Sequence, residues 1–345
     1  MVQRIIGGKT PGRAQGSSPP PRQSHSPAVT RVRVDEGGEG QRLDNFLIKL
    51  LKGVPKTHVY RVIRSGEVRV NKGRAGADTR LALGDEVRVP PVRVADRSAE
   101  PPVPAREFPV VFEDEYLIAV DKPAGVAVHG GSGVSFGVIE QLRRARPQAK
   151  FLELVHRLDK ETSGLLLVAK KRSALTALQD QFRSRETGKI YAALVIGAWP
   201  QNKKVIDVPL HKFLTAEGER RVRTVGPSTS SGRAGEPEGR RSITLVQVAR
   251  QFDAFTLLDV TLKTGRTHQI RVHLAGEGHP IAGDEKYGDF ALNKALARGE
   301  AVRGHKFDRM FLHARRLRFD HPATGEVMEL ESPLPAECEK LLSAL

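Results

Sequence analysis

Apolar residues near the start of the chain recur at helical spacing: Leu43, Phe46, Leu47, Leu50 and Leu51. Pro55 then breaks the chain, and a second helix is expected to follow with Thr57 as its N-cap. Short runs at residues 67–70 and 86–89 lie next to turn-forming residues and predict strands. These patterns predict a small unit of two helices and short strands over residues 41–95.

The apolar pattern of residues 109–345 predicts a larger domain that opens with a hairpin around an acidic turn at residues 113–115. Further strands are expected at four apolar runs: 165–169, 192–196, 244–248 and 255–262. Helices are expected at 138–146, 173–183, 267–275 and 336–342, with Thr267 able to cap the third. Because strands dominate and helices fall between them irregularly, we predict an α+β fold with a mixed, largely antiparallel sheet.

Three segments have the composition of irregular chain. Residues 1–30 are rich in Gly, Pro, Ser and Arg and are expected to be a disordered tail. The Pro-rich residues 96–108 are expected to be a stiff linker between the two units. Residues 226–241 are rich in Gly, Ser, Pro and Arg, which predicts a flexible insertion between strands of the large domain.

The charge of the chain points to a polyanionic partner. Its 345 residues carry a net charge of +16, and such a surplus favours nucleic acid over a merely basic soluble enzyme. The single cysteine, Cys338, cannot form an intramolecular disulfide, and this fits a reducing cytoplasm. No apolar run reaches the ~18 residues expected of a membrane span. We therefore expect a cytoplasmic protein that binds nucleic acid.

Cations gather in the small unit. Residues 41–100 hold 13 Lys and Arg against 7 Asp and Glu. Five of these cations lie on or beside the second helix and its exit: Lys56, Arg61, Arg64, Arg69 and Lys72. A solvated helix face is the ordinary meaning of scattered charge. Here the cations cluster opposite apolar positions, which favours contacts to RNA phosphates.

The chain lacks the common signatures of metal and nucleotide chemistry, such as a His-Glu-x-x-His helix, a Cys pair or a phosphate loop. His268, His273 and His279 follow one another at spacings that place them on different faces of a helix. A metal site there is not expected. What remains is a reaction that needs neither metal nor cofactor.

Asp159 is the best candidate for that reaction. It lies between Arg157 and Lys160, before the turn at Ser163 and Gly164 and the apolar run that follows. Neighbouring cations favour an ionised carboxylate, which can attack or stabilise a cationic sugar centre. The alternative reading is a salt bridge that anchors a loop, and chemistry alone favours that alternative.

Four segments together change this balance: residues 121–129, 156–170, 188–195 and 264–274. They resemble the motifs of the RluA-type pseudouridine synthases, which isomerise uridine in RNA. The small unit resembles the S4 RNA-binding fold. The resemblance covers about residues 41–340 and is strongest to the RluC branch, whose members modify several uridines of the large-subunit ribosomal RNA.

This resemblance implies a pseudouridine synthase fold and a set of roles. Asp159 is the essential aspartate, Arg271 pairs with it, and Tyr191 lies against the target base, where it is also expected to help remove the C5 proton. Arg157 is expected to enter the gap left by the flipped nucleotide. His156, Lys122 and Ile270 are expected to bind the substrate. The resemblance implies no cofactor and no metal, and large-subunit ribosomal RNA as the partner. A monomer is expected, although the sequence does not fix the oligomeric state.

Two rival functions remain open from the sequence. A non-catalytic RNA-binding factor for ribosome assembly could keep the fold, although Asp159, Tyr191 and Arg271 are all present. A glycosylase also flips bases and breaks the same kind of bond, but it would release free base. Glycoside hydrolysis usually needs two carboxylates, and no second acid stands out beside Asp159.

Overall fold

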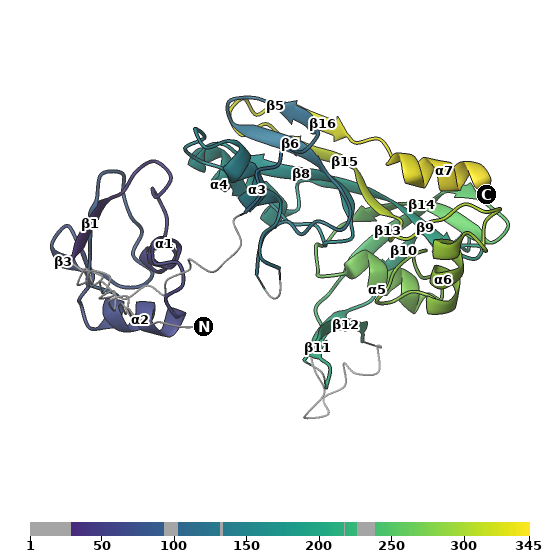
Figure 1. The fold of residues 1–345 in the computed structure, drawn as a ribbon, viewed down its shortest axis with the longest axis horizontal. Helices are drawn as coiled ribbons and strands as arrows, with labels where there is room; N and C mark the ends of the chain where they lie inside the picture. Colours follow the sequence, from purple (N-terminus) through teal and green to yellow (C-terminus); the bar gives the residue numbers. More distant parts are fainter. Residues whose placement is uncertain (1–28, 93–102, 132–133, 217, 226–238) are drawn as a thin grey trace, which may run out of the picture. The chain divides into compact units, whose positions relative to one another are not determined.

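The computed structural model describes residues 29–92, 103–131, 134–216, 218–225 and 239–345. These residues form two compact units, which divide near residue 96 (Figure 1). Most of the expected tail, part of the expected linker and most of the expected insertion lie outside the described residues. None of the helices in the described ranges is long and apolar enough to cross a membrane.

The small unit packs two helices against a four-stranded antiparallel sheet with the order β1-β4-β2-β3. Its elements are β1 (Thr30–Arg33), α1 (Leu43–Leu50), α2 (Lys56–Arg64), β2 (Arg69–Val70), β3 (Gly73–Arg74) and β4 (Glu86–Val89). Both helices bury the apolar stripe read from the sequence, with Leu43, Leu47, Val59 and Val62 at most 1% exposed. The unit therefore has a core of its own.

Two expectations for the small unit are wrong. Thr30, placed in the disordered tail, begins β1, which adds an edge strand beside β4. The residues of β1 are mostly exposed, so the sequence lacks the apolar alternation that would have predicted this strand. Helix α2 begins at Lys56 after Pro55, so Thr57 is inside the helix and is not its cap. Proline's fixed φ suits it to the start of a helix.

The large unit is built on a ten-stranded sheet whose main path is β10-β13-β14-β9-β15-β8-β6-β5. Its strands are β5 (Val110–Glu113), β6 (Leu117–Lys122), β7 (Glu153–Leu154), β8 (Ser163–Ala169), β9 (Gly188–Ile196), β10 (Val205–Asp207), β13 (Ile243–Gln251), β14 (Phe255–Leu262), β15 (Leu312–Asp320) and β16 (Val327–Glu331). Strand pairs are antiparallel except β15 with β8. The predicted mixed, largely antiparallel α+β fold is confirmed.

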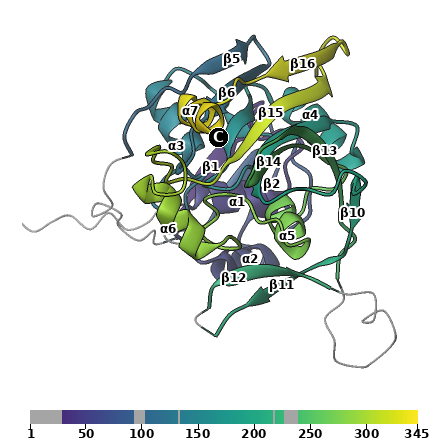
Figure 2. The same ribbon diagram turned by 90° about the vertical axis from the view of Figure 1, so that its right-hand side faces the viewer.

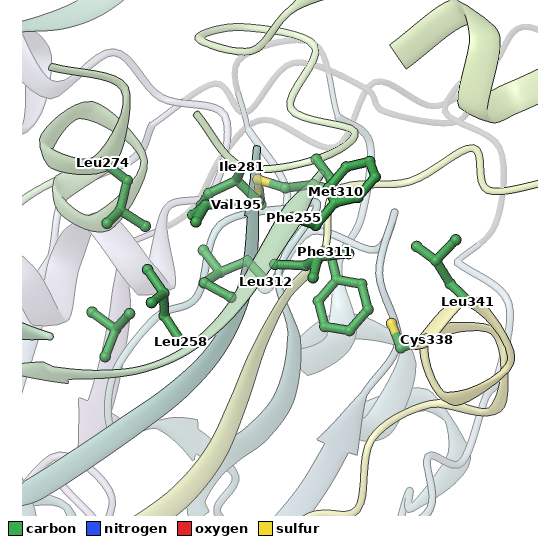
Figure 3. Packing of buried hydrophobic residues seen from close by; sticks show 14 of the residues in the cluster. Val195, Phe255, Leu258, Leu274, Ile281, Met310, Phe311, Leu312, Cys338 and Leu341 are labelled. Atoms are coloured by element: carbon green, nitrogen blue, oxygen red, sulfur yellow. The ribbon is translucent and has the colours of Figure 1, made fainter. Parts of the chain in front are cut away.

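Helices pack against this sheet and enclose its core. They are α3 (Val138–Ala145), α4 (Arg172–Ser184), α5 (Gln269–Gly276), α6 (Phe290–Arg298) and α7 (Ala336–Ala344). Figure 3 shows Leu274 of α5 and Leu341 of α7 on either side of Leu312 and Phe311. The C-terminal helix thus closes the core opposite α5, the helix that carries Arg271.

The large unit differs from expectation at three places. Phe108, placed in the linker, is 3% exposed in the core beside α3, so the folded unit begins before residue 109. Helix α5 begins at Gln269, and its N-cap is His268 in the left-handed conformation, so Thr267 is not the cap. A hairpin of β11 (Leu210–Leu214) and β12 (Arg220–Thr224) was not expected; it lies beside α5 (Figure 2).

A close strand contact fixes the loop that precedes β8. Gly164 has φ of +107°, and a Cβ there would lie 2.3 Å from the carbonyl oxygen of Ala314. Only glycine permits this approach. It allows β8 to pair in parallel with β15, where Ser163 lies opposite His313. Ser163 Oγ is hydrogen-bonded to His313 Nδ1 at 2.9 Å and accepts from Arg309 Nη2 at 2.7 Å, which anchors the end of the Asp159 loop.

Candidate active site

A pocket of about 480 Å³ brings together most of the expected site residues. Those that line it are His156, Arg157, Asp159, Tyr191, Ile270 and Arg271. They come from the loop before β8, from β9 and from the first turn of α5. Residues that are far apart in sequence therefore converge on one concave site, as expected for a catalytic centre.

The acidic centre of the pocket is an aspartate that faces a buried arginine. The Asp159 side chain is 21% exposed, and its Oδ2 lies 3.5 Å from Arg271 Nη1, within ion-pair distance. Arg271 makes its hydrogen bonds elsewhere: Nε and Nη2 donate to Asp284 at 2.7 and 2.8 Å. Two bonds to Asp284 orient the guanidinium. Its third nitrogen is thereby directed at Asp159.

Asp284 was not predicted from the sequence, although it fixes the arginine. It is 1% exposed, and its Oδ1 also accepts from the backbone N–H groups of Lys286 and Tyr287 at 2.8 and 3.0 Å. Burial, the largest single influence, acts to raise the pKa of Asp284, but the hydrogen bonds and charge of Arg271 and the two backbone N–H groups together hold that pKa below its usual value. The preceding Gly283 has φ of +76°, and a Cβ there would lie 1.9 Å from the carbonyl oxygen of Arg309.

His268, the N-cap of α5, is the second group beside Asp159. Its Nε2 lies 3.8 Å from Asp159 Oδ2, and its Nδ1 is hydrogen-bonded to the Tyr287 hydroxyl at 2.9 Å. Burial lowers the pKa of His268 to about 4, although the Asp159 charge opposes the shift. The imidazole is therefore neutral at pH 7. The Tyr287 hydroxyl also accepts from Val222 N at 3.1 Å, which ties the β11–β12 hairpin to this side of the pocket.

Tyr191 lies in the pocket wall on the central strand β9, where it pairs with Val260 of β14 and Ala314 of β15. Burial, and then the charge of Asp159, raise the pKa of Tyr191 above its usual value. The phenol is therefore protonated at neutral pH. Its ring is available for stacking, but its hydroxyl is not a ready proton acceptor.

His156 is held as a neutral aromatic wall of the pocket. Its ring stacks on Phe182 with centroids 4.6 Å apart, and its Nε2 accepts from Leu167 N at 3.1 Å. Burial, followed by the charge of Lys189, lowers the pKa of His156 to about 3. Ile270 forms an apolar part of the lining and is also packed into the main core.

Lys122 does not lie at the pocket surface, so the expectation that it binds substrate is wrong. It is 0% exposed, and its Nζ donates to the carbonyl oxygens of Pro123, Val126 and Lys160 at 2.8, 2.8 and 3.0 Å. Burial lowers its pKa to about 7, with the charge of Glu161 opposing. Lys122 thus ties the residue after Asp159 to the end of β6.

A buried chain of hydrogen bonds supports the start of α5. Gln269 Oε1 accepts from Thr264 Oγ1 at 2.8 Å and from Arg266 N at 3.1 Å. Its amide donates to Thr244 Oγ1 at 3.0 Å, and that hydroxyl is bonded to His273 Nδ1 at 2.8 Å. Since buried polar networks fix local geometry, this one sets the turn on which Arg271 lies.

Cations surround the mouth of the pocket. Four of the lining residues are exposed cations, and two more are half-buried: Arg157, Arg183, Arg185 and Lys263, then Lys189 and Arg266. Asp159 is the only acidic side chain among the residues that line the pocket. A rim of this charge favours a phosphate-bearing substrate. Within the described ranges, no three His, Cys, Asp or Glu side chains are placed to hold a metal ion.

The five cations expected to bind RNA all lie at the surface of the small unit. Lys56, Arg61, Arg64 and Lys72 are exposed, and Arg69 is half-buried with its Nε donating to Gly66 O at 2.9 Å. Three of them lie on α2, whose opposite face carries the core residues Val59 and Val62.

Comparison with known proteins identifies the class. Residues 116–276 match the family described as RNA pseudouridylate synthase, and residues 41–87 match the S4 domain. The chain belongs to the RNA pseudouridylate synthases and is an isomerase with an N-terminal S4 domain. This confirms the resemblance noted in the sequence and argues against a non-catalytic RNA-binding protein.

Two curated relatives illustrate the similarity. "Ribosomal large subunit pseudouridine synthase C" of Yersinia pestis is 48% identical over 329 residues, 94% of this chain and 98% of the relative. The protein of the same name from Escherichia coli strain K12 is 46% identical over 329 residues, with the same coverage of 94% and 98%.

Solved structures agree. Human RNA Pseudouridylate Synthase Domain Containing 4 has a TM-score of 0.53 and 25% identity, covering 68% of this chain and 92% of that one. Human RNA Pseudouridylate Synthase Domain Containing 1 has a TM-score of 0.52 and 26% identity, covering 68% and 87%.

Proposed function

We propose that this protein converts specific uridines of large-subunit ribosomal RNA to pseudouridine, acting as a monomer in the cytoplasm. The names of relatives that align with 94% of the chain support this substrate. The observation that carries the proposal is one ionisable carboxylate, Asp159, faced by the oriented cation of Arg271 in a pocket walled by Tyr191.

The reaction needs one carboxylate beside the ribose. The bond between ribose C1′ and uracil N1 breaks, the base turns, and C1′ joins C5. C5 loses its proton and N1 gains one, so the product is an isomer of the substrate. Asp159 either bonds to the sugar or stabilises the cationic centre that forms at C1′. Arg271 pairs with the carboxylate and sets its direction.

The target base has to leave its helix before it can enter the pocket. Arg157, exposed at the rim, enters the vacated space and offsets part of the lost stacking. The other rim cations hold the flanking phosphates. Tyr191 stacks on the flipped uracil; because its pKa is raised, we assign it to holding the base and not to accepting the C5 proton.

Selection of the site in RNA is assigned to the S4 domain and the chain that joins it to the catalytic unit. Every uridine presents the same base to the pocket, so discrimination requires contacts outside it. The exposed cations of α2 supply phosphate and shape contacts.

The test uses purified full-length protein and transcripts of large-subunit ribosomal RNA, with pseudouridine mapped by nucleotide position. We expect pseudouridine at a small number of uridines and no release of free uracil, without an added cofactor. Release of uracil would indicate a glycosylase. Transcripts that stay unmodified, while a small-subunit or transfer RNA is modified, would refute the proposed substrate.

A further inference from the structure

The S4 domain contains a second pocket, of about 390 Å³, lined wholly by its own residues. One side is formed by Tyr60, Ile63 and Arg64 of α2. The other is formed by Arg74 and residues 75–77, which are small: Ala, Gly and Ala. The pocket thus combines an aromatic ring, two guanidinium groups and open space beside residues that lack large side chains.

The aromatic ring is anchored at its polar end. Tyr60 is 38% exposed, and its hydroxyl donates to Asp44 Oδ2 at 3.1 Å. Asp44 is 3% exposed and also accepts from Arg42 Nε and Nη2 at 3.2 and 2.8 Å. The Arg42 hydrogen bond lowers the pKa of Asp44, so the acceptor stays ionised at neutral pH. A ring fixed in this way loses little freedom when a ligand stacks on it.

Arg74 is held in position, and neither pocket arginine is neutralised. Arg74 Nη2 donates to the carbonyl oxygen of Arg64 at 3.3 Å, which holds it against the end of α2. Gly66 makes room for this arrangement, because a Cβ there would lie 2.6 Å from Arg74 Nε. Within the described ranges, neither Arg64 nor Arg74 forms an ion pair with an acid. Both are exposed and free to bind an anion.

We propose that this pocket binds one unpaired nucleotide of the RNA substrate, with its base stacked on Tyr60 and its phosphate between Arg64 and Arg74. An acidic peptide or a free anion would use the arginines alone, whereas a nucleotide also uses the anchored ring. The proposal rests on the function above and deepens it, because it assigns part of RNA selection to a single-stranded nucleotide and not to backbone charge alone.

Steady-state kinetics with full-length protein and a large-subunit ribosomal RNA fragment test the pocket. We expect Tyr60→Ala to raise KM about tenfold with kcat unchanged, since base–aromatic stacking is sequence-tolerant and strong. Tyr60→Phe keeps the ring and is expected to raise KM less than threefold. Arg74→Gln is expected to raise KM several-fold and to reduce the salt dependence of binding by about one phosphate contact.

Arg33→Gln is the matched control. Arg33 is an exposed arginine of the same unit, but it lies on β1, at the opposite edge of the sheet from Arg74 in β3. We expect its KM to equal that of the wild type. If Tyr60→Ala leaves KM unchanged while the wild type forms pseudouridine, the nucleotide pocket is refuted and the proposed function stands. A wild type that forms none refutes the function itself.

Photocrosslinking of the wild-type chain avoids any folding defect of the variants. RNA containing 4-thiouridine at unpaired positions is expected to crosslink to peptides that contain Tyr60 or residues 74–77. Crosslinks confined to other parts of the S4 domain would overturn the proposal. Equal increases in KM for Tyr60→Ala and Tyr60→Phe would also overturn it, because the ring itself would then contribute nothing.

Discussion

The catalytic pocket and the S4 domain both depend on charge, but they hold it in opposite ways. Arg271 and Asp284 have side chains 7% and 1% exposed, and they neutralise each other with two hydrogen bonds. On α2, Lys56, Arg61 and Arg64 are exposed to solvent. A buried charge interacts strongly with one partner, whereas an exposed charge is screened and acts as one of many.

This difference predicts how each region responds to substitution. In the pocket, removing one group leaves its partner buried and unpaired, so single changes should have large effects. On α2 and at its exit, each exposed cation is expected to add one modest contact to RNA, so the effects of substitution there should be small and roughly additive.

Asp159→Asn should reduce the rate of pseudouridine formation at least about a thousandfold, as removal of a catalytic nucleophile does in other enzymes. The amide keeps the shape of the side chain and removes its charge. RNA affinity and thermal midpoint should stay near wild type, because the side chain is partly exposed and makes no short ion pair. Single-turnover assays measure the rate, and a variant within tenfold of wild type would refute the role of Asp159.

Asp284→Asn should destabilise the protein by roughly 3–5 kcal/mol, the cost of breaking a buried ion pair. Activity should also fall, by about a hundredfold, because Arg271 is no longer oriented toward Asp159. The matched control is Asp207→Asn, which removes a carboxylate paired with exposed Arg241. It should cost under about 1 kcal/mol. Urea unfolding measures both; equal costs would contradict the contrast between buried and exposed charge.

The sequence predicted the sheet and the pocket residues better than it predicted their supports. Every residue of β8 is buried, and such a strand appears in the sequence as a continuous apolar run. Asp284 was missed because it acts by orienting Arg271 through hydrogen bonds. The spacing of residues in the sequence does not reveal such a contact. Lys122 was misplaced because a lysine's type gives no sign that three carbonyl groups surround it inside the fold.

The cap assignments at Thr57 and Thr267 failed for a related reason. Threonine is a common N-cap, but Pro55 starts α2 earlier. At α5, His268 takes the N-cap position without a side-chain cap bond, and Gln269 accepts from the Arg266 N–H before the helix, so Thr267 is not the cap. Several bonding solutions satisfy the same helix end, and only the tertiary structure chooses among them.

Lys122→Met should cost about 1–3 kcal/mol, because three carbonyl oxygens lose their buried donor. We also expect kcat to fall about tenfold, since the Lys160 carbonyl beside Asp159 is released. Lys150→Met, at an exposed lysine of the same unit, should change stability by less than about 0.5 kcal/mol. Loss of stability with unchanged kcat would limit Lys122 to a purely structural role.

Acid should destabilise the catalytic unit through two half-buried histidines of the pocket, His156 and His268. Burial lowers the pKa of His156 to about 3 and of His268 to about 4, from 6.5. Below pH 6.5 these histidines are protonated in the unfolded chain, whereas in the folded protein they stay neutral down to about pH 4. Because the unfolded state then binds more protons, the free energy of unfolding falls as the pH drops through this window. His268→Asn, which suits the left-handed backbone, should reduce the slope measured by urea unfolding.

The smallest effects are expected from the exposed cations of the S4 domain outside its pocket. Lys56→Gln, Arg61→Gln and Lys72→Gln should each weaken RNA binding less than about tenfold. Each should also reduce the salt slope by roughly 0.7, the value for one phosphate on a single strand. Binding isotherms at several salt concentrations measure both. In the triple variant, the three losses of binding free energy should add while kcat is unchanged, because each screened charge contributes independently. A single substitution that abolished RNA binding would show that this surface, like the pocket, depends on one contact.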